Sequence, residues 1–364
     1  MKEQNVPQSR VRKAIEAFGR GEIVVVTDDN DRENEGDLIL AATKATPEKM
    51  AFIIRHTCGI VCAPLTGEIA RRLSLAPMVA DGDAIHGTAF TVSVDYRHGT
   101  TTGISADDRT ATVRNLANGN VGPSDFVRPG HVFPLIAKDG GVLMRSGHTE
   151  AAIDLCRLSG IEPVAAICEL VNDDGTVMRG PQVGAFAETH GLKQISVADL
   201  IAHRQAREKL VTRVAEFTVA SEIGELQGYA YVTPFDRVHH YAFVYGRIGD
   251  GLNVPTRLHR ANVLEDVFGG AKPIHAALLR FKEAGTGVLV YLRDGTSGVP
   301  VSSVGEGHTG SELERRAQWR EVGLGAQILR DLRISSIQLL ATRSRTYVGL
   351  AGFGIEIIAT EPLE

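Results

Sequence analysis

The sequence predicts an α/β fold with a mixed sheet, followed by a second domain that is rich in strands. Two patterns support this prediction. Up to about residue 214, short apolar runs alternate with amphipathic stretches that are long enough for helices. After that point the run FTVASEIGELQGYAYVT begins a mainly strand-like pattern. A chain of 364 residues is long enough for two or three domains of ordinary size.

The first expected elements enclose an acidic segment. Residues 9–20 are expected to form an amphipathic helix that Ser9 caps. The apolar runs at 23–27 and 38–42 are expected to be buried strands, one on each side of the segment. The stretch TPEKMAFIIRHT (46–57) opens a helix, because Thr is a good cap and Pro suits the first helical position.

The rest of the chain continues this alternation. Further strands are expected at 60–65, 89–95, 131–137 and 162–171, and helices at 106–117 and 149–160. Residues 195–214 are expected to form one long helix that becomes highly charged. We place a domain boundary near residue 208, which gives domains at 1–208 and 209–364.

Bulk composition limits the function classes. The formal charge of −5 and the pI near 6.2 argue against a general nucleic-acid binder, which would present a basic face. The four cysteines (Cys58, Cys62, Cys156 and Cys168) lack paired metal spacing, as in a reduced protein. The polar N-terminus has no apolar core of a signal peptide, and no apolar run is long enough to span a bilayer. We therefore expect a soluble, cytoplasmic protein without membrane partners.

The acidic segment DDNDRENEGD (28–37) is the strongest local signal. Its carboxylates from Asp29 to Asp37 recur at every second position, so an extended chain would place five like charges on one face. A calcium loop is excluded, because Asn34 replaces the required Gly and Leu40 the bidentate carboxylate. A solvated acidic loop and a catalytic magnesium site both remain open from this stretch alone.

Three other stretches carry possible chemistry. RSGHTE (145–150) places an Arg and a His just before a helix, where backbone N–H groups favour anions. TTTGISADD (100–108) is a hydroxyl-rich loop that suits a phosphate or polyol, although such turns are often merely structural. Glu169 falls inside an apolar strand, where a carboxylate needs a partner or a function. His148 is a metal ligand or an ordinary capping histidine.

Together these stretches resemble one family, 3,4-dihydroxy-2-butanone 4-phosphate synthase of riboflavin biosynthesis. The resemblance covers roughly residues 8–205 and rests on motifs that occur in the family's order. These are DDNDRENEGD, HTCGIVCAPL, GTAFTVSVDYRHGTTTGISADDR, RPGHVFPL, RSGHTEAAIDL and CELVNDDG. It implies conversion of D-ribulose 5-phosphate to L-3,4-dihydroxy-2-butanone 4-phosphate and formate by a homodimer that uses Mg²⁺ or Mn²⁺.

The resemblance also implies roles for single residues. Glu33 and His148 match metal ligands, and the implied catalytic residues are His131, Glu169, Glu35 and Asp37. The implied substrate-binding residues are Arg32, Glu33, Asp37, Thr102, Arg145, Ser146, Gly147, His148, Thr149 and Glu169. Cys58 falls in an active-site loop of the family, and a plain buried cysteine is the alternative. Enolisation, loss of water, skeletal migration and formate release need several acids and bases, which a group of carboxylates can supply.

Residues 209–364 resemble GTP cyclohydrolase II, an α+β family that is often fused behind the synthase. RLHRANVLEDVFGG, GLGAQILRDLRISSIQLL and RTYVGLAGFGIEII carry the likeness, and Arg257 and His259 are retained from the GTP segment. The functional positions of that family are mostly changed. The three zinc-binding cysteines align with Asn262, Pro273 and His275, the catalytic Asp with Gln318, and two GTP contacts with Ala341 and Thr346, while the catalytic Arg is kept as Arg320.

We therefore expect a cyclohydrolase fold that has lost its activity and binds no zinc. No cysteine follows Cys168, so a thiolate site cannot form, and ring opening would lack an activated water. The domain would then support dimerisation, bind a nucleotide or contact another enzyme of riboflavin synthesis. Two alternatives stay open for the whole chain: a bifunctional enzyme with a working cyclohydrolase, and a non-catalytic regulator that binds a sugar phosphate or a nucleotide.

Overall fold

The computed structural model describes residues 6–28, 34–79, 88–234, 238–293, 323–342 and 355–363. The chain divides into two compact units, Met1–His203 and Arg204–Glu364, which are described separately. The boundary that we expected near residue 208 stays a prediction. Among the described residues, none of the helices is both long and apolar enough to cross a membrane.

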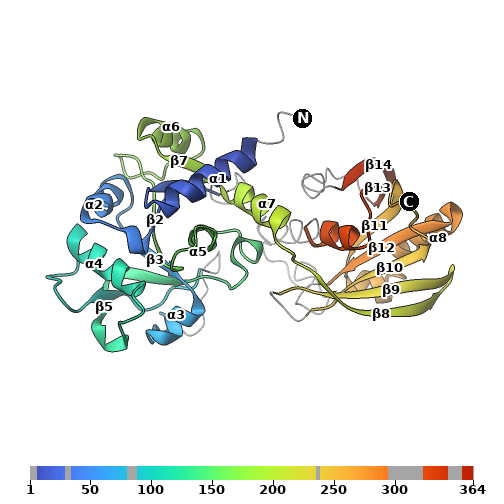
Figure 1. The fold of residues 1–364 in the computed structure, drawn as a ribbon, viewed down its shortest axis with the longest axis horizontal. Helices are drawn as coiled ribbons and strands as arrows, with labels where there is room; N and C mark the ends of the chain where they lie inside the picture. Colours follow the sequence, from blue (N-terminus) through green and yellow to red (C-terminus); the bar gives the residue numbers. More distant parts are fainter. Residues whose placement is uncertain are drawn as a thin grey trace. The chain divides into compact units, whose positions relative to one another are not determined.

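The first unit combines helices with a seven-stranded sheet (Figure 1). Its helices are α1 (Val6–Gly19), α2 (Pro47–His56), α3 (Gly67–Arg72), α4 (Ala106–Leu116), α5 (His148–Leu158), α6 (Pro181–Thr189) and α7 (Val197–Arg207), the last of which ends in the second unit. Its short 3₁₀ helices are η2 (Ala42–Lys44), η3 (Pro123–Asp125) and η4 (Gly141–Leu143). Its strands are β1 (Val24–Thr27), β2 (Gly36–Ala41), β3 (Cys62–Leu65), β4 (Val94–Tyr96), β5 (Phe126–Ile136), β6 (Ala165–Glu169) and β7 (Lys193–Ser196).

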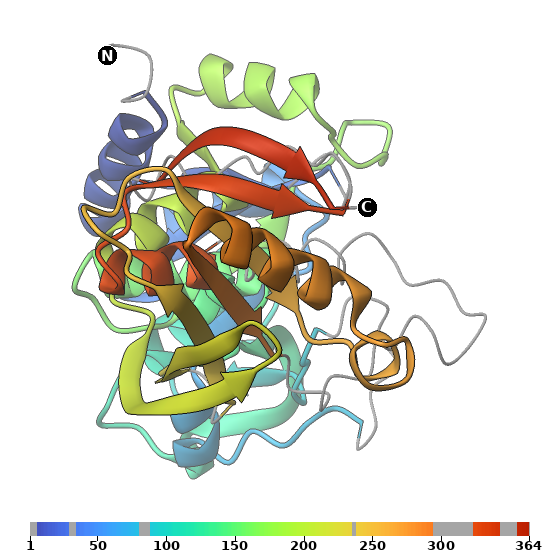
Figure 2. The same cartoon turned by 90° about the vertical axis from the view of Figure 1, so that its right-hand side faces the viewer.

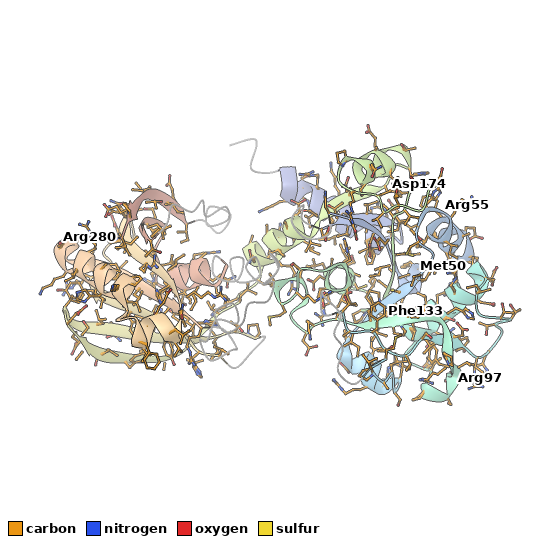
Figure 3. All side chains as sticks on the ribbon, turned by 180° about the vertical axis from the view of Figure 1, so that it is seen from behind. Met50, Arg55, Arg97, Phe133, Asp174 and Arg280 are labelled. Atoms are coloured by element: carbon orange, nitrogen blue, oxygen red, sulfur yellow. The ribbon has the colours of Figure 1, made fainter. Side chains whose placement is uncertain are left out.

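The sheet is mixed, as the sequence predicts. Its strand order is β4-β5-β3-β6-β2-β1-β7, with β3–β5 and β1–β7 parallel and the other neighbours antiparallel. Leu38 and Leu40 of β2 share one core with Met50 of α2 and Val113 of α4. Figure 3 shows Met50 on the inner side of its helix and Arg55, which is exposed, on the outer side. Because side chains alternate along a strand, Asp37 projects from the opposite face of β2, where α5 packs.

Three of the expected elements were wrong in extent. The first helix begins at Val6 rather than Ser9, so Ser9 lies within it. The expected long helix at 195–214 is shorter, because β7 pairs with β1 through Ser196 and β8 starts at Thr212. The expected strand at 89–95 is reduced to isolated bridges before β4. The cap at Thr46 is confirmed, since its hydroxyl accepts the backbone N–H of Lys49.

The second unit is built on another seven-stranded mixed sheet, so the prediction of a strand-rich second domain is confirmed. Its strands are β8 (Thr212–Ser221), β9 (Gly224–Val232), β10 (His240–Gly246), β11 (Val254–Arg260), β12 (Thr286–Leu292), β13 (Ser336–Ala341) and β14 (Glu356–Pro362). They follow the order β14-β13-β11-β12-β10-β9-β8. A π-helical turn, η5 (Leu264–Phe268), precedes α8 (Lys272–Ala284), and a further helix covers 323–331. Figure 2 shows α8 lying along the sheet, where Phe281 and Leu289 share a core.

Candidate active site

Two of the predicted catalytic carboxylates face each other on neighbouring strands. Asp37 near the start of β2 is the cross-strand partner of Glu169 at the end of β6. Directly opposed residues of an antiparallel pair project from the same face, so both carboxylates lie on one side of the sheet. This pairing brings together residues that are 132 positions apart in the chain, as the register Asp37↔Glu169 shows.

A third predicted carboxylate, Glu35, completes this group. Glu35 and Glu169 share a side-chain hydrogen bond, and Arg179 donates from Nη2 to Glu35 Oε1 at 2.8 Å. Burial raises the pKa of Glu169 to about 8, and the hydrogen bond and charge of Glu35 act in the same direction. A carboxyl group with this pKa keeps its proton at neutral pH. The cluster therefore contains a proton donor among potential acceptors.

His131 in β5 is held by a carboxylate that we did not single out in the sequence. Asp95 Oδ2 lies 2.7 Å from His131 Nδ1, and Asp95 Oδ1 accepts the His131 backbone N–H at 2.8 Å. Gly103 of the hydroxyl-rich loop packs against this pair, since a Cβ there would lie 2.0 Å from Asp95 Oδ2. The contact with Asp95 orients the ring and places Nδ1 as the hydrogen-bond donor, which leaves Nε2 for proton transfer.

The sheet register places His131 and Glu169 at the same end of the sheet. Cys62 of β3 pairs with Phe133 of β5 on one side and with Ile167 of β6 on the other. His131 precedes Phe133 by two residues in a parallel neighbour, and Glu169 follows Ile167 by two residues in an antiparallel one. His131 and Glu169 therefore both lie beside the residues that immediately precede β3, and Asp37 lies next to Glu169. The register thus brings the described catalytic candidates to one edge.

His148 joins the group from α5. It is the first residue of that helix and is buried, and its Nδ1 lies 3.8 Å from Asp37 Oδ1. An imidazole beside several carboxylates forms a donor set that suits Mg²⁺ or Mn²⁺. Glu33, the other predicted metal ligand, and Arg32 lie outside the described residues. Within the described parts of the chain, no three His, Cys, Asp or Glu side chains gather closely enough to hold a metal by themselves.

The structure gives Arg145 other contacts than the sequence suggested. Its guanidinium is 5% exposed and donates from Nη1 to Glu150 Oε2 at 2.6 Å and from Nη2 to Thr88 Oγ1 at 2.9 Å. Gly147 is the N-cap of α5, and a Cβ there would lie 2.4 Å from Arg145 Nη1. This segment is thus built around a buried ion pair. Of the other predicted residues, Ser146 is half-buried, Thr149 is buried and Thr102 is exposed in its loop.

Asp95, Glu150 and Arg179 were not predicted from the sequence. Asp95 stands at the end of an expected strand, and Glu150 is part of the stretch RSGHTE. The sequence therefore shows both carboxylates close to candidate site residues. Their partners follow only from tertiary contacts. Arg179 reaches Glu35 across an isolated bridge between the two residues, and no local pattern indicates that contact.

In the second unit, the positions that align with zinc-binding cysteines have structural contacts. Asn262 Oδ1 accepts the backbone N–H groups of Leu264 and Glu265. Pro273 occupies the first turn of α8, where its missing N–H is not needed. His275 Nδ1 lies 2.7 Å from Glu222 Oε2 on the exposed surface. The predicted positions Gln318, Arg320 and Thr346 fall outside the described residues.

The retained residues Arg257 and His259 are buried in β11. His259 Nε2 lies 2.8 Å from Asp266 Oδ1, and Tyr291 donates its hydroxyl to Asp266 Oδ2 at 2.6 Å. Burial lowers the pKa of His259 despite the neighbouring carboxylate, so the ring is neutral at neutral pH. Arg257 Nη1 donates to the carbonyl of Leu340.

Comparison with known proteins gives two family matches. Residues 12–203 match the model of 3,4-dihydroxy-2-butanone 4-phosphate synthase, and residues 212–362 match that of GTP cyclohydrolase II. The chain belongs to the 3,4-dihydroxy-2-butanone 4-phosphate synthase family. It is a synthase enzyme of riboflavin biosynthesis, with a synthase domain followed by a GTP cyclohydrolase II domain.

The relatives of this synthase cover nearly its whole length. It is 44% identical to "Monofunctional riboflavin biosynthesis protein RIBA 2, chloroplastic" of Arabidopsis thaliana, over 97% of this chain and 76% of that protein. It is also 44% identical to "Riboflavin biosynthesis protein RibBA" of Rhodococcus erythropolis, over 97% of this chain and 89% of that protein.

Among solved structures, RibBX of A. baumannii, described as a two-domain synthase, is 34% identical. Its TM-score is 0.82, and the match covers 97% of this chain and 98% of that one. A synthase in complex with two magnesium ions is 49% identical with a TM-score of 0.53, over 54% of this chain and 97% of that one.

Proposed function

We propose that the synthase domain converts D-ribulose 5-phosphate to L-3,4-dihydroxy-2-butanone 4-phosphate and formate by acid–base chemistry. The observation that carries this proposal is the Glu35–Asp37–Glu169 cluster, in which burial and a neighbouring carboxylate keep Glu169 protonated. Proton removal next to a carbonyl and protonation of a departing hydroxyl need a base and an acid in one site. The cluster, with His131 at the same sheet edge, supplies both.

The surroundings of each residue determine its role in proton transfer. Glu169 donates a proton, since its pKa lies near 8, and Glu35 shares that proton through their hydrogen bond. Asp37 acts beside Glu169 on the same face. His131 moves protons at Nε2, because Asp95 holds Nδ1. Several groups with different environments suit a reaction with successive proton transfers.

A divalent cation, Mg²⁺ or Mn²⁺, fits the donor set of this site. Glu33 and His148 would hold it, and the buried imidazole of His148 already faces the Asp37 carboxylate. When bound, the cation acts as a Lewis acid that stabilises negative charge on substrate oxygens. A related synthase in complex with two magnesium ions supports magnesium as the cation.

The substrate would lie between the acidic cluster and the start of α5. Arg32, Glu33, Asp37 and Thr102 would contact the sugar carbons, together with Glu169. The segment Arg145–Thr149 would receive the phosphate at the N-terminal end of α5, where backbone N–H groups and the helix dipole favour an anion. Arg145 adds positive charge, although it also anchors the segment through Glu150.

We further propose that the second domain is a degenerate cyclohydrolase that binds no zinc. The support is chemical: Asn262, Pro273 and His275 cannot act as three thiolates, and the first two serve the backbone around η5 and α8. The names of the Arabidopsis relative and of the A. baumannii structure are consistent with a single activity. The domain would then support a homodimer, bind a nucleotide or contact a pathway enzyme in the cytoplasm.

A bifunctional enzyme is the second candidate. It is favoured by the match of residues 212–362 to GTP cyclohydrolase II and by a 43% identical Arabidopsis protein that is named bifunctional. Zinc ligands for this candidate would have to come from outside the three aligned positions.

The deciding experiment measures formate release from ribulose 5-phosphate by the full-length protein with Mg²⁺ and with EDTA. We expect turnover that EDTA abolishes and that added Mg²⁺ or Mn²⁺ restores. Glu33→Gln and His148→Ala should each reduce turnover by at least about tenfold while the circular dichroism spectrum stays unchanged. Full activity of both variants would contradict the metal assignment, and absence of formate from the metal-loaded wild type would contradict the function.

A further inference from the structure

Two cysteines from distant parts of the synthase domain are in contact at the edge of the sheet where β6 ends in Glu169. Cys58 Sγ lies 3.7 Å from Cys168 Sγ. Cys58 is exposed in the loop before β3, whereas Cys168 is buried in β6. The backbone holds this approach in place, because Cys58 N–H donates to the carbonyl of Glu169 at 2.9 Å and Thr57 bridges to Leu170.

The cysteines of the chain differ in reactivity. A hydrogen bond from Cys168 lowers the pKa of Cys58 to about 6, so Cys58 is a thiolate at neutral pH. The pKa of Cys168 is raised by the same hydrogen bond, by burial and by the Cys58 charge. Burial raises the pKa of Cys62 and of Cys156 to about 12, which keeps both as unreactive thiols. The domain therefore pairs an exposed nucleophilic sulfur with a neighbouring thiol.

We propose that Cys58 and Cys168 are a redox pair that peroxide converts into a reversible disulfide, and that this disulfide lowers synthase activity. The proposal depends on the contact of the two sulfurs, on the exposure of Cys58 and on the backbone hydrogen bond from Cys58 to Glu169. An S–S bond is about 2.0 Å long, so the sulfurs have to approach by roughly 1.7 Å. Rotation of the exposed Cys58 side chain can supply most of this movement.

The oxidation balances with hydrogen peroxide as the oxidant. The Cys58 thiolate attacks one peroxide oxygen, the O–O bond breaks, and the departing hydroxide takes a proton from solvent to become water. This step leaves a sulfenic acid at Cys58 and removes the negative charge that acts on Cys168. The Cys168 sulfur then attacks the Cys58 sulfur, the S–O bond breaks, and the Cys168 proton leaves with that oxygen as a second water.

The effect on activity rests on the proposed function of the carboxylate cluster. Burial and the neighbouring Glu35 and Asp37 raise the pKa of Glu169 most, and the Cys58 charge adds a smaller contribution in the same direction. Disulfide formation removes this charge and ties the loop before β3 to β6. The pKa of Glu169 would then be lower, so a smaller fraction of Glu169 would carry the proton that it donates at neutral pH.

The test treats full-length protein with hydrogen peroxide after removal of reductant, and then maps peptides by mass spectrometry without reduction. We expect a cross-linked Cys58–Cys168 peptide that dithiothreitol removes. Formate release from ribulose 5-phosphate should fall with the same time course as the cross-link forms and should recover with dithiothreitol. Failure to find this peptide, or a cross-link from Cys58 to Cys62 instead, would overturn the proposal.

Variants make the test independent of activity. Cys168→Ser should leave the oxidation of Cys58 at the sulfenic acid, which dimedone labels, and should give no cross-link. Cys62→Ser is the matched control and should form the Cys58–Cys168 cross-link at wild-type yield. A cross-link that forms without any change in activity would refute the regulatory part. A cross-link in a protein that never releases formate would contradict the proposed function and leave the redox pair intact.

Discussion

Asp95 fixes the imidazole of His131 at two points and does not itself need to touch substrate. One carboxylate oxygen faces Nδ1 and the other accepts the backbone N–H of the same residue. Such a residue acts through orientation and through the choice of tautomer. The Gly103 backbone covers the pair, so the arrangement is packed as well as hydrogen-bonded.

We predict that Asp95→Asn lowers kcat by about 10- to 100-fold with little change in KM, because the amide nitrogen would face Nδ1 and disfavour the active tautomer. Steady-state kinetics of formate release measure this split, and Asp95→Glu should restore part of the rate. Asp125→Asn is the matched control, since Asp125 contacts the exposed His98 at 2.9 Å and belongs to no proposed site. Equal effects of both Asn variants would indicate a merely structural role for Asp95.

Cys58 provides a prediction on pH dependence. Its pKa is lowered to about 6, so the reactive thiolate is present above this pH and is lost as the pH falls through it. The rate of Cys58 alkylation by iodoacetamide should therefore reach half of its maximum near pH 6 and be constant above about pH 7. Quantitative peptide mapping between pH 5 and 9 measures this rate. A rate that still rises above pH 8 would show an ordinary thiol.

At the scale of elements, the junction between η4 and α5 combines a helix start with a buried ion pair. Arg145 precedes α5 and reaches Glu150 in its first turn, and both side chains are almost fully buried. Glu150 Oε1 also accepts the backbone N–H of Lys138, so one carboxylate connects two segments. Removal of the Arg145 guanidinium takes away the positive charge that lies against the buried Glu150 carboxylate.

We predict that Arg145→Ala destabilises the synthase domain by about 3–5 kcal/mol, in addition to any loss of substrate affinity. Arg145→Lys should be less harmful to stability but should still raise KM, because it keeps the charge and loses the planar fork. Calorimetry of the full chain and steady-state kinetics separate the two effects. Arg157→Ala is a suitable control, since this exposed Arg of the same helix donates to the carbonyl of Asp139. Unchanged stability of Arg145→Ala would mean that the ion pair is dispensable.

At the scale of the whole molecule, the two domains differ in the side chains that stand at the positions predicted to be functional. The synthase domain brings its carboxylates and histidines to one sheet edge. The second domain has a seven-stranded sheet and a His259–Asp266–Tyr291 contact. The positions that the resemblance aligns with zinc ligands hold Asn262, Pro273 and His275.

We predict that the purified chain releases formate from ribulose 5-phosphate but not from GTP, even with zinc supplied, because no aligned thiolate can hold the metal that activates water. Metal analysis after dialysis should find far less than one zinc per chain. The ribulose 5-phosphate reaction in the same preparation serves as the control for correct folding. Stoichiometric zinc together with formate from GTP would establish the bifunctional candidate.

The mixed-sheet class, most strand positions and the nature of the first domain were predictable from the sequence. Local pattern is sufficient for these, since apolar runs, the cap at Thr46 and ordered motifs act within short windows. The absence of cysteines after Cys168 likewise followed from the sequence alone. The predicted bounds were wrong in two kinds of place. At β7, residues that were expected to be helical pair with the distant strand β1. Before β4, the expected strand forms only isolated bridges in the described residues.

Only the tertiary structure decided which charges meet. The register Asp37↔Glu169 and the hydrogen bond between Glu35 and Glu169 bring three carboxyl groups together. Burial and these neighbours raise the pKa of Glu169, which composition cannot predict. The same applies to Asp95 on His131, to Glu150 on Arg145 and to the contact of Cys58 with Cys168. The physical reason is that protonation and reactivity depend on burial and on neighbours within a few ångströms, and here those neighbours come from distant segments of the chain.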